Sequence, residues 1–121
     1  MGQNFWIVAS CALVFGMATG EASAASQKQI AGVAAYYSAD YKGRTASGAT
    51  YDPNKFTCAH RTLPFGTHLR VTDPRTKRSV IVTVNDRGPF TKGRMLDLSL
   101  AAAKSLRIID RGLAQVTASV E

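Results

Sequence analysis

Hydrophobic and polar residues alternate with a period of two in several short stretches of the chain. The strictest alternation covers residues 114–120, where alanine and valine are separated by Gln, Thr and Ser. Such alternation is typical of a β-strand with one buried face. Segments 30–37, 68–73 and 78–85 are also predicted to be strands. The Asp-Pro turn signal at residues 73–74 predicts that the last two form a hairpin.

A helical spacing appears in the segment that follows Ser99. Leu100, Ala103 and Leu106 recur at the spacing of one helix face, and serine is a common N-cap residue. The stretch 38–49 is rich in Gly, Ser, Ala and Thr without apolar periodicity, which predicts a loop. Short strands, Gly/Pro turns and one small helix predict a compact, mostly β barrel.

The first 24 residues have the composition of an export signal. They are apolar from Phe5 to about Met17 and end in the small-x-small pattern Ala22-Ser23-Ala24. A retained membrane anchor is the alternative, but the apolar core is short for a bilayer span. A loose lipoprotein box around Cys11 makes a lipid anchor the lesser expectation. The chain is therefore expected to be exported to the periplasm or cell envelope.

The 121 residues are expected to comprise a signal peptide (1–24), a short lead-in (25–33) and one barrel domain (34–121). Without the signal, 15 basic residues face 7 acidic ones, a net charge of +8. A basic surplus favours a polyanionic partner. Export argues against nucleic acid as this partner, so an acidic cell-envelope polymer is expected. The basic residues are scattered, so solubility explains part of the surplus.

Cysteine and histidine are too few for a disulfide or a familiar metal site. Cys58 is the only cysteine after the signal, which excludes an intramolecular disulfide in the exported chain. A small buried core residue is the favoured interpretation of Cys58, with a thiol nucleophile as the alternative. His60 and His68 lack cysteine or glutamate partners at metal-ligand spacing, so no metal and no cofactor is expected.

Polar side chains that could carry chemistry gather in the predicted loops, where a rigid scaffold commonly places functional groups. Asp86 follows the alternating Val80, Val82 and Val84, as if it continued their face, and is either a turn residue or a working acid. His60 is equally consistent with a loop role and a functional one. The other candidates are Arg44, Thr45, Ser47, Thr57, Arg87, Arg94 and Asp97. For Asp97, a capping or turn bond with Arg94 as surface neighbour is the favoured interpretation.

Four motifs together resemble the rare lipoprotein A family of septal-ring lytic transglycosylases. They are "TASG" (45–48), "AHRTLPFGT" (59–67), "VTVNDRGPF" (82–90) and "R-x-x-D-L-S" (94–99), and the resemblance runs from Ala34 to the end. It implies a six-stranded double-psi β-barrel of the expansin and barwin type, with one or two short helices. It also implies peptidoglycan glycan strands as substrate, preferentially strands without stem peptides. Many relatives carry a peptidoglycan-binding SPOR domain, and none is expected here.

The resemblance also implies roles for individual residues. Asp86 takes the position of the catalytic acid, with His60 beside it in the site. The acid protonates the oxygen of the β-1,4 bond between N-acetylmuramic acid and N-acetylglucosamine, and the muramyl C6 hydroxyl closes on C1. The product is a 1,6-anhydro end. The expected substrate-binding residues are Tyr36, Tyr37, Arg44, Ser47, Thr57 and Arg87, the tyrosines offering flat faces and the arginines meeting muramyl carboxylates.

Ala49 departs from the family pattern, because active members often read T-A-S-G-E with an active-site glutamate at this position. Alanine cannot titrate.

Three hypotheses about function follow: an exported lytic transglycosylase, a non-catalytic expansin-like module that binds peptidoglycan, and an envelope barrel that binds a protein. The expected partners are glycan strands and candidate divisome or other envelope proteins, with the chain itself a monomer.

Overall fold

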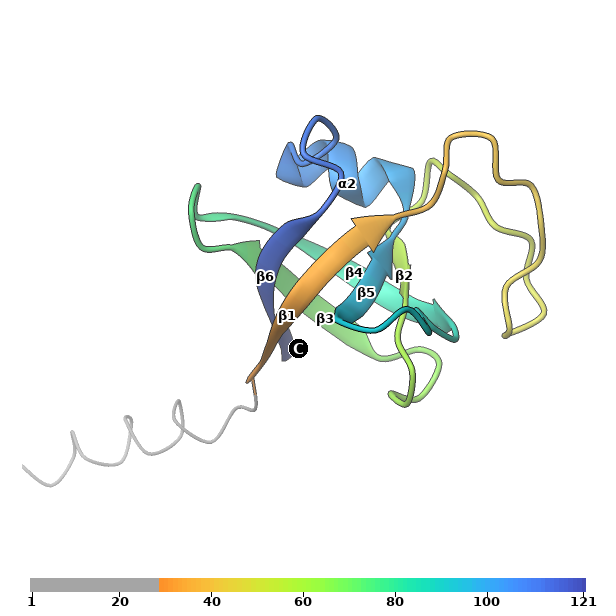
Figure 1. Cartoon of the computed structure of the whole chain (residues 1–121). Coiled ribbons are helices and arrows are strands. Elements are labelled where there is room, and N and C mark those ends of the chain that lie inside the picture. Colours follow the sequence, from red (N-terminus) through yellow and green to blue (C-terminus); the bar gives the residue numbers. More distant parts are fainter. Residues whose placement is uncertain (1–28) are drawn as a thin grey trace, which may run out of the picture.

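The computed structural model describes residues 29–121, which form a closed barrel of six strands with one helix. The elements are β1 (Gln29–Tyr36), β2 (Thr57–Ala59), β3 (His68–Asp73), β4 (Arg78–Asp86), β5 (Arg94–Leu98), α2 (Leu100–Leu106) and β6 (Ala114–Val120). Figure 1 shows the strands wrapped around a common core, with α2 beside them. The predicted six-stranded barrel is confirmed. The predicted signal peptide and the less favoured alternative of a lipid anchor at Cys11 lie outside the described residues.

The order of strands around the barrel is β1-β5-β2-β4-β3-β6. The pairs β1–β5 and β2–β4 are parallel, and the other pairs are antiparallel. The predicted hairpin of β3 and β4 is confirmed, and its turn is closed by the Lys77 N–H, which donates to the Asp73 carbonyl at 2.8 Å. β1 begins at Gln29, so its first residues fall in the stretch 25–33 assigned to a lead-in.

The barrel interior is filled by the apolar faces of the strands. Leu69, Val82, Leu96 and Val116 are fully buried, as the alternation predicts. Cys58 is also fully buried, and burial raises the pKa of its thiol to about 12. The thiolate is the reactive form of cysteine, and the raised pKa keeps the Cys58 thiol protonated. Cys58 is therefore a core residue, as favoured from the sequence.

The predicted helix is present as α2. The Ser99 side chain caps it by accepting the Ala102 N–H at 3.3 Å, and Ala102, Ala103 and Leu106 face the core. The helix ends at Arg107, which adopts the left-handed conformation with φ 58°. Within the described part of the chain, no helix is long and apolar enough to cross a membrane.

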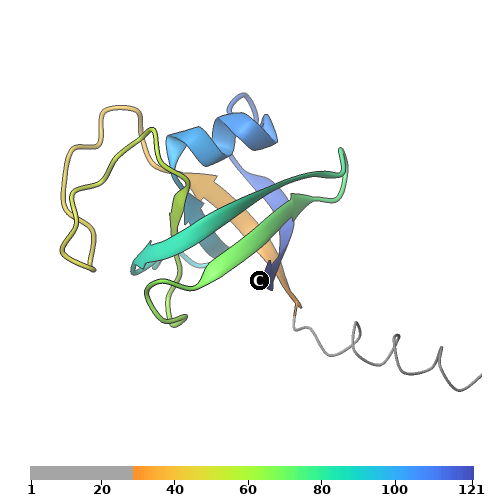
Figure 2. The same ribbon diagram turned by 180° about the vertical axis from the view of Figure 1, so that it is seen from behind.

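The connection between β1 and β2, residues 37–56, stands out to one side of the barrel in both views (Figures 1 and 2). We call it the β1–β2 loop. It contains the predicted loop 38–49 and folds back on itself: the Tyr51 N–H donates to the Gly43 carbonyl at 2.9 Å, and the Thr45 N–H to the Ala49 carbonyl at 2.8 Å. The loop is therefore an ordered small hairpin that can hold side chains in place.

Candidate functional site

Asp86 is the last residue of β4 and belongs to a row of residues that pair with one another across four neighbouring strands. The strand register pairs Ala35 with Asp97, Asp97 with Ala59, and Ala59 with Asp86. Along β2 and β4, Cys58 pairs with Val84 but the next pair skips one residue of β4. This bulge places Asp86 on the same side as Ala59, opposite to the buried Val84. The expectation that Asp86 continues the buried valine face is therefore wrong.

The half-buried carboxylate of Asp86 is held by donors from three parts of the chain. The Tyr37 hydroxyl donates to Oδ2 at 2.5 Å. The backbone N–H groups of Ala46 and Arg87 donate to Oδ1 at 2.7 and 2.8 Å. Oδ1 is thus fully used, whereas Oδ2 keeps a lone-pair direction for a further partner. The carboxyl group is therefore fixed in place with one oxygen able to engage another molecule.

Tyr37 belongs to a cluster of three tyrosines. Its ring stacks on Tyr51 with centroids 4.4 Å apart and planes at 18°, and Tyr41 packs against both at 5.2 and 5.4 Å. Burial raises the pKa of Tyr37, and the hydrogen bond and charge of Asp86, followed by the charge of Asp97, raise it further. The phenol therefore remains a donor to Asp86. Tyr41 and Tyr51 were not among the predicted site residues, because no spacing signal in the sequence links them to Asp86.

The "TASG" motif fastens the β1–β2 loop to the end of β4. The Ser47 N–H donates to the Asn85 carbonyl at 3.2 Å, next to the bond between Ala46 and Asp86. The hydroxyls of Thr45 and Ser47 are 2.8 Å apart. The Ala49 carbonyl accepts the Thr45 N–H and so closes the same turn. Ala49 is exposed. The position at which the family resemblance implies a glutamate therefore belongs to the turn that holds Asp86.

His60 meets Asp86 through the main chain, because its N–H donates to the Asp86 carbonyl at 3.2 Å. Its imidazole Nδ1 accepts the N–H groups of Thr62 and Leu63, both at 3.1 Å, which places the proton of the neutral ring on Nε2. Burial lowers the pKa of His60, and the charges of Arg61 and Arg87 lower it further. Among residues 29–121, no hydrogen bond joins the imidazole to the Asp86 carboxylate.

The His60 ring lines a small pocket of about 160 Å³ whose other walls are mainly apolar side chains from β1, β3 and β6. Arg87 also serves this region: its guanidinium donates to the carbonyls of His60 and Leu63 at 3.1 and 2.8 Å. The same group stacks over Phe65, 4.1 Å from the ring centroid. Arg87 thus orders the loop after β2, a role that its sequence context does not indicate.

Two of the expected substrate-binding residues are engaged with the barrel itself. The Tyr36 hydroxyl donates to the Ile109 carbonyl at 2.7 Å, and its ring packs against the core. Thr57 lies in β2, where its N–H donates to the Ser99 hydroxyl at 3.3 Å. The structure brings together Tyr37, Ala46 and Asp86, and leaves Tyr36 and Thr57 in structural contacts.

Asp97 lies on β5 rather than in a turn, in the same row as Asp86. Arg94 is its neighbour, as expected, with Nη2 2.5 Å from the carboxylate. The capping role belongs to Ser99, not to Asp97. The Nε of Arg94 is buried without a hydrogen-bond partner in the described part of the chain. Across residues 29–121, histidines, cysteines and acids form no group of three that could hold a metal ion.

Comparison with known proteins places this site in context. Residues 29–118 match a family model described as lytic transglycolase. Over 92 residues the chain is 50% identical to a probable endolytic peptidoglycan transglycosylase RlpA of Nostoc sp., covering 74% of this chain and 25% of that protein. The chain thus spans about a quarter of the length of this relative.

Two solved structures share the fold. The Streptomyces papain inhibitor superposes with a TM-score of 0.63 at 26% identity, covering 77% of this chain and 94% of that one. An expansin of Clavibacter michiganensis superposes with a TM-score of 0.61 at 24% identity, covering 78% of this chain and 50% of that one. At this identity, the likeness to the expansin is evidence for a shared fold only.

Proposed function

Because the chain belongs to the lytic transglycolase family of double-psi β-barrel domains, as the resemblance to rare lipoprotein A predicted, we propose that it cleaves peptidoglycan glycan strands. The observation that carries the proposal is the Asp86 carboxylate, fixed by Tyr37 and by two backbone N–H groups with Oδ2 open to a further partner. The name of the Nostoc relative supports peptidoglycan as the substrate class. A substrate in the cell wall requires export.

In the proposed reaction, Asp86 begins as a carboxylic acid with the proton on Oδ2. That proton passes to the oxygen that links C1 of N-acetylmuramic acid to C4 of N-acetylglucosamine, and the C1–O bond breaks. The muramyl C6 oxygen bonds to C1, and its own proton returns to the Asp86 carboxylate. No water is consumed, the acid is regenerated, and the products are a 1,6-anhydromuramyl end and a free C4 hydroxyl. Tyr37 would orient Oδ2 throughout.

His60 is proposed as the second catalytic residue. Its Nδ1 is occupied by two backbone N–H groups, so the neutral ring offers the Nε2–H to a substrate oxygen. The backbone bond from His60 to the Asp86 carbonyl couples the positions of the two residues. For strand binding, we propose the tyrosine surface of the β1–β2 loop together with Arg44, Ser47 and the basic charge of the chain.

A second candidate function is a peptidoglycan-binding module without catalysis. The observation in its favour is Ala49, which stands in the turn that fastens the loop to β4 and carries no titratable group. A barrel without a glutamate at position 49 keeps its fold and its basic side chains. It can therefore still bind an acidic glycan. Product analysis separates the two functions.

The test incubates the purified protein with glycan strands that lack stem peptides and identifies products by mass spectrometry. The proposal predicts 1,6-anhydromuramyl ends. Reducing muramyl ends without the anhydro ring would show hydrolysis and contradict the proposed reaction. Co-sedimentation with peptidoglycan without any new ends would support the binding module instead.

A further inference from the structure

Arginine side chains in different parts of the barrel differ in their hydrogen bonding. Residues 29–121 include nine arginines, and six of them place the guanidinium on a carbonyl or carboxylate oxygen of the protein. In this part of the chain, the guanidinium groups of Arg75, Arg78 and Arg107 have no such partner. All three are exposed, in the turn between β3 and β4 or at the end of α2. Their donors are therefore free for a ligand.

These two segments lie on one side of the molecule and are joined through the buried Asp73. The Arg75 N–H donates to Asp73 Oδ1 at 2.9 Å, and the Arg111 side chain pairs with Oδ2. In both views, the turn and the end of α2 lie across the barrel from the β1–β2 loop (Figures 1 and 2). We call the basic side chains of this side the basic pole. They are Arg75, Lys77, Arg78, Lys104, Arg107 and Arg111.

The basic pole concentrates positive charge. Residues 73–78 and 104–111 hold six basic and two acidic side chains, a net charge of +4. One of the two acids, Asp73, is fully buried. Neither segment contains an aromatic residue, the usual partner of a sugar face. Phosphate groups, which arginine binds in a bidentate manner, therefore suit the basic pole better than a glycan does.

Lys77 and Arg107 stand at backbone positions that favour glycine. Their φ angles are 67° and 58°, in the left-handed region that residues other than glycine rarely adopt. Both side chains are exposed, and within residues 29–121 neither forms an ion pair. The fold therefore does not require these two cations, and glycine can replace both.

An exposed leucine adjoins the basic pole. Leu113 is 54% exposed and lies two residues after Arg111, just before β6 begins. Basic side chains beside an apolar one are typical of surfaces that rest on anionic membranes, where cations meet phosphates and the apolar group enters the interface. A soluble polyanion would leave Leu113 in water. We propose that the basic pole and Leu113 form a docking surface for anionic phospholipid headgroups.

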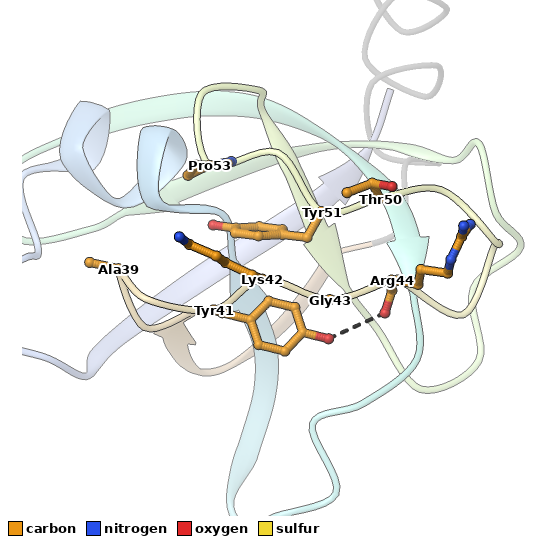
Figure 3. A pocket seen from close by; sticks show the side chains of 8 residues that line it. All are labelled: Ala39, Tyr41, Lys42, Gly43, Arg44, Thr50, Tyr51 and Pro53. Atoms are coloured by element: carbon orange, nitrogen blue, oxygen red, sulfur yellow. Dashed lines mark hydrogen bonds between the residues drawn. The ribbon is translucent and has the colours of Figure 1, made fainter.

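Docking in this way determines which side of the barrel faces away from the lipid. The Ala46 N–H links the β1–β2 loop to Asp86, and this loop lies across the barrel from the basic pole. The loop contains a pocket of about 440 Å³ whose lining includes Tyr41 and Arg44, joined by the hydrogen bond drawn in Figure 3. The pocket and the proposed acid site would therefore stay accessible on a docked barrel. The docking surface does not depend on whether the barrel cleaves glycan.

The test is sedimentation of the full chain with two kinds of vesicle at about 0.1 M salt, where charges near a membrane still act. One kind contains phosphatidylglycerol and phosphatidylcholine in equal parts, and the other contains phosphatidylcholine alone. The unaltered protein should bind the anionic vesicles more tightly. Lys77→Gly/Arg107→Gly should melt no lower than the unaltered protein, since glycine suits both positions. It should bind the anionic vesicles about thirty-fold less tightly, because each basic residue near the surface contributes about a factor of five.

Two further variants separate the basic pole from the total charge. Arg75→Gln/Arg78→Gln should also weaken binding about thirty-fold, without a change at a left-handed position. The matched control is Lys55→Gln/Lys92→Gln, which removes the same charge from exposed residues outside the basic pole. It should bind within about two-fold of the unaltered protein. Equal losses in the pole and control variants, or an unaltered protein without preference for anionic vesicles, would overturn the proposal.

Leu113→Ser distinguishes a lipid surface from soluble phosphate, with inorganic polyphosphate as the soluble probe. This variant should bind anionic vesicles about ten-fold less tightly, because it removes the apolar group from the interface. Its binding to polyphosphate should equal that of the unaltered protein. Vesicle binding that Leu113→Ser leaves unchanged would indicate a general phosphate surface and overturn the assignment to lipid.

Discussion

The Tyr37 hydroxyl donates a hydrogen bond to Asp86 Oδ2 across 2.5 Å, joining the end of β1 to the end of β4. The adjacent Tyr36 points its hydroxyl to the Ile109 carbonyl instead. Two neighbouring tyrosines thus face different parts of the molecule. One orients the proposed acid, and the other secures the chain after α2.

Replacing Tyr37 with phenylalanine removes the donor to Oδ2 but keeps most of the ring surface. We expect kcat on peptide-free strands to fall about ten-fold, with little change in KM, because a positioned carboxyl loses one of its supports. Tyr36→Phe is the control: it should lower the free energy of unfolding by about 1 kcal/mol and leave kcat unchanged. Equal kcat values for Tyr37→Phe and the unaltered protein would remove Tyr37 from the account.

Introducing a glutamate at position 49 supplies the carboxylate that the family resemblance implies there. We expect Ala49→Glu to raise the cleavage rate about 10²-fold, the usual scale of a positioned acid or base. Ala49 is exposed, so the longer side chain can be accommodated. Ala49→Gln tests size without charge and should give no gain. A glutamate variant no faster than the glutamine variant would show that this position does not limit catalysis.

His60 can be dissected because its two ring nitrogens have different tasks. His60→Asn keeps an acceptor for the Thr62 and Leu63 N–H groups but removes Nε2. We expect it to melt like the unaltered protein and to cleave about 10²-fold more slowly. His60→Ala should lose activity and also about 1 kcal/mol of stability. Unimpaired cleavage by His60→Asn would restrict the imidazole to ordering its loop.

Asp73 provides a test of stability that is independent of the site. It is fully buried, pairs with Arg111 and accepts the Arg75 N–H. Burial acts to raise the pKa of Asp73, but the hydrogen bonds and charges of Arg111 and Arg75 outweigh it, so its pKa lies below the usual value. Its contribution is therefore present above the unfolded pKa of about 3.9 and is lost as pH falls through the folded value.

Removing the Asp73 carboxylate should expose this contribution. Asp73→Asn should destabilise the barrel at pH 7 by about 3 kcal/mol, because it leaves Arg111 without its charge partner. Its stability should also depend less on pH below about 4 than that of the unaltered protein. Denaturant unfolding at several pH values measures both effects. Parallel pH profiles for the two proteins would contradict this role.

The regular parts of the barrel could be predicted from the sequence because their patterns are local. The alternation in β6, the turn between β3 and β4, and Ser99 ahead of α2 each fall within about ten residues. β2 and β5 are three and five residues long, too short for alternation to stand out. Their pairing depends on partners far along the chain, so the strand position of Asp97 could not be read from its neighbours.

The arrangement of the candidate site was predicted in part. The motifs identified Asp86, but the bulge that turns it outward depends on how β4 pairs with β2. Likewise, the pattern cannot distinguish Tyr36 from Tyr37, since the difference comes from what each hydroxyl meets in the folded barrel. Tyr41 and Tyr51 enter the site only through the folding of the β1–β2 loop.

Asp86 is the proposed acid of a cleavage that consumes no water. The most direct test is mass spectrometry of the ends formed on peptide-free strands by the unaltered protein and by Asp86→Asn. The variant keeps an acceptor and the side-chain shape, and unchanged melting would verify its fold. If Asp86 is this acid, 1,6-anhydromuramyl ends form with the unaltered protein and none form with the variant. The same ends formed at an equal rate by Asp86→Asn would contradict it.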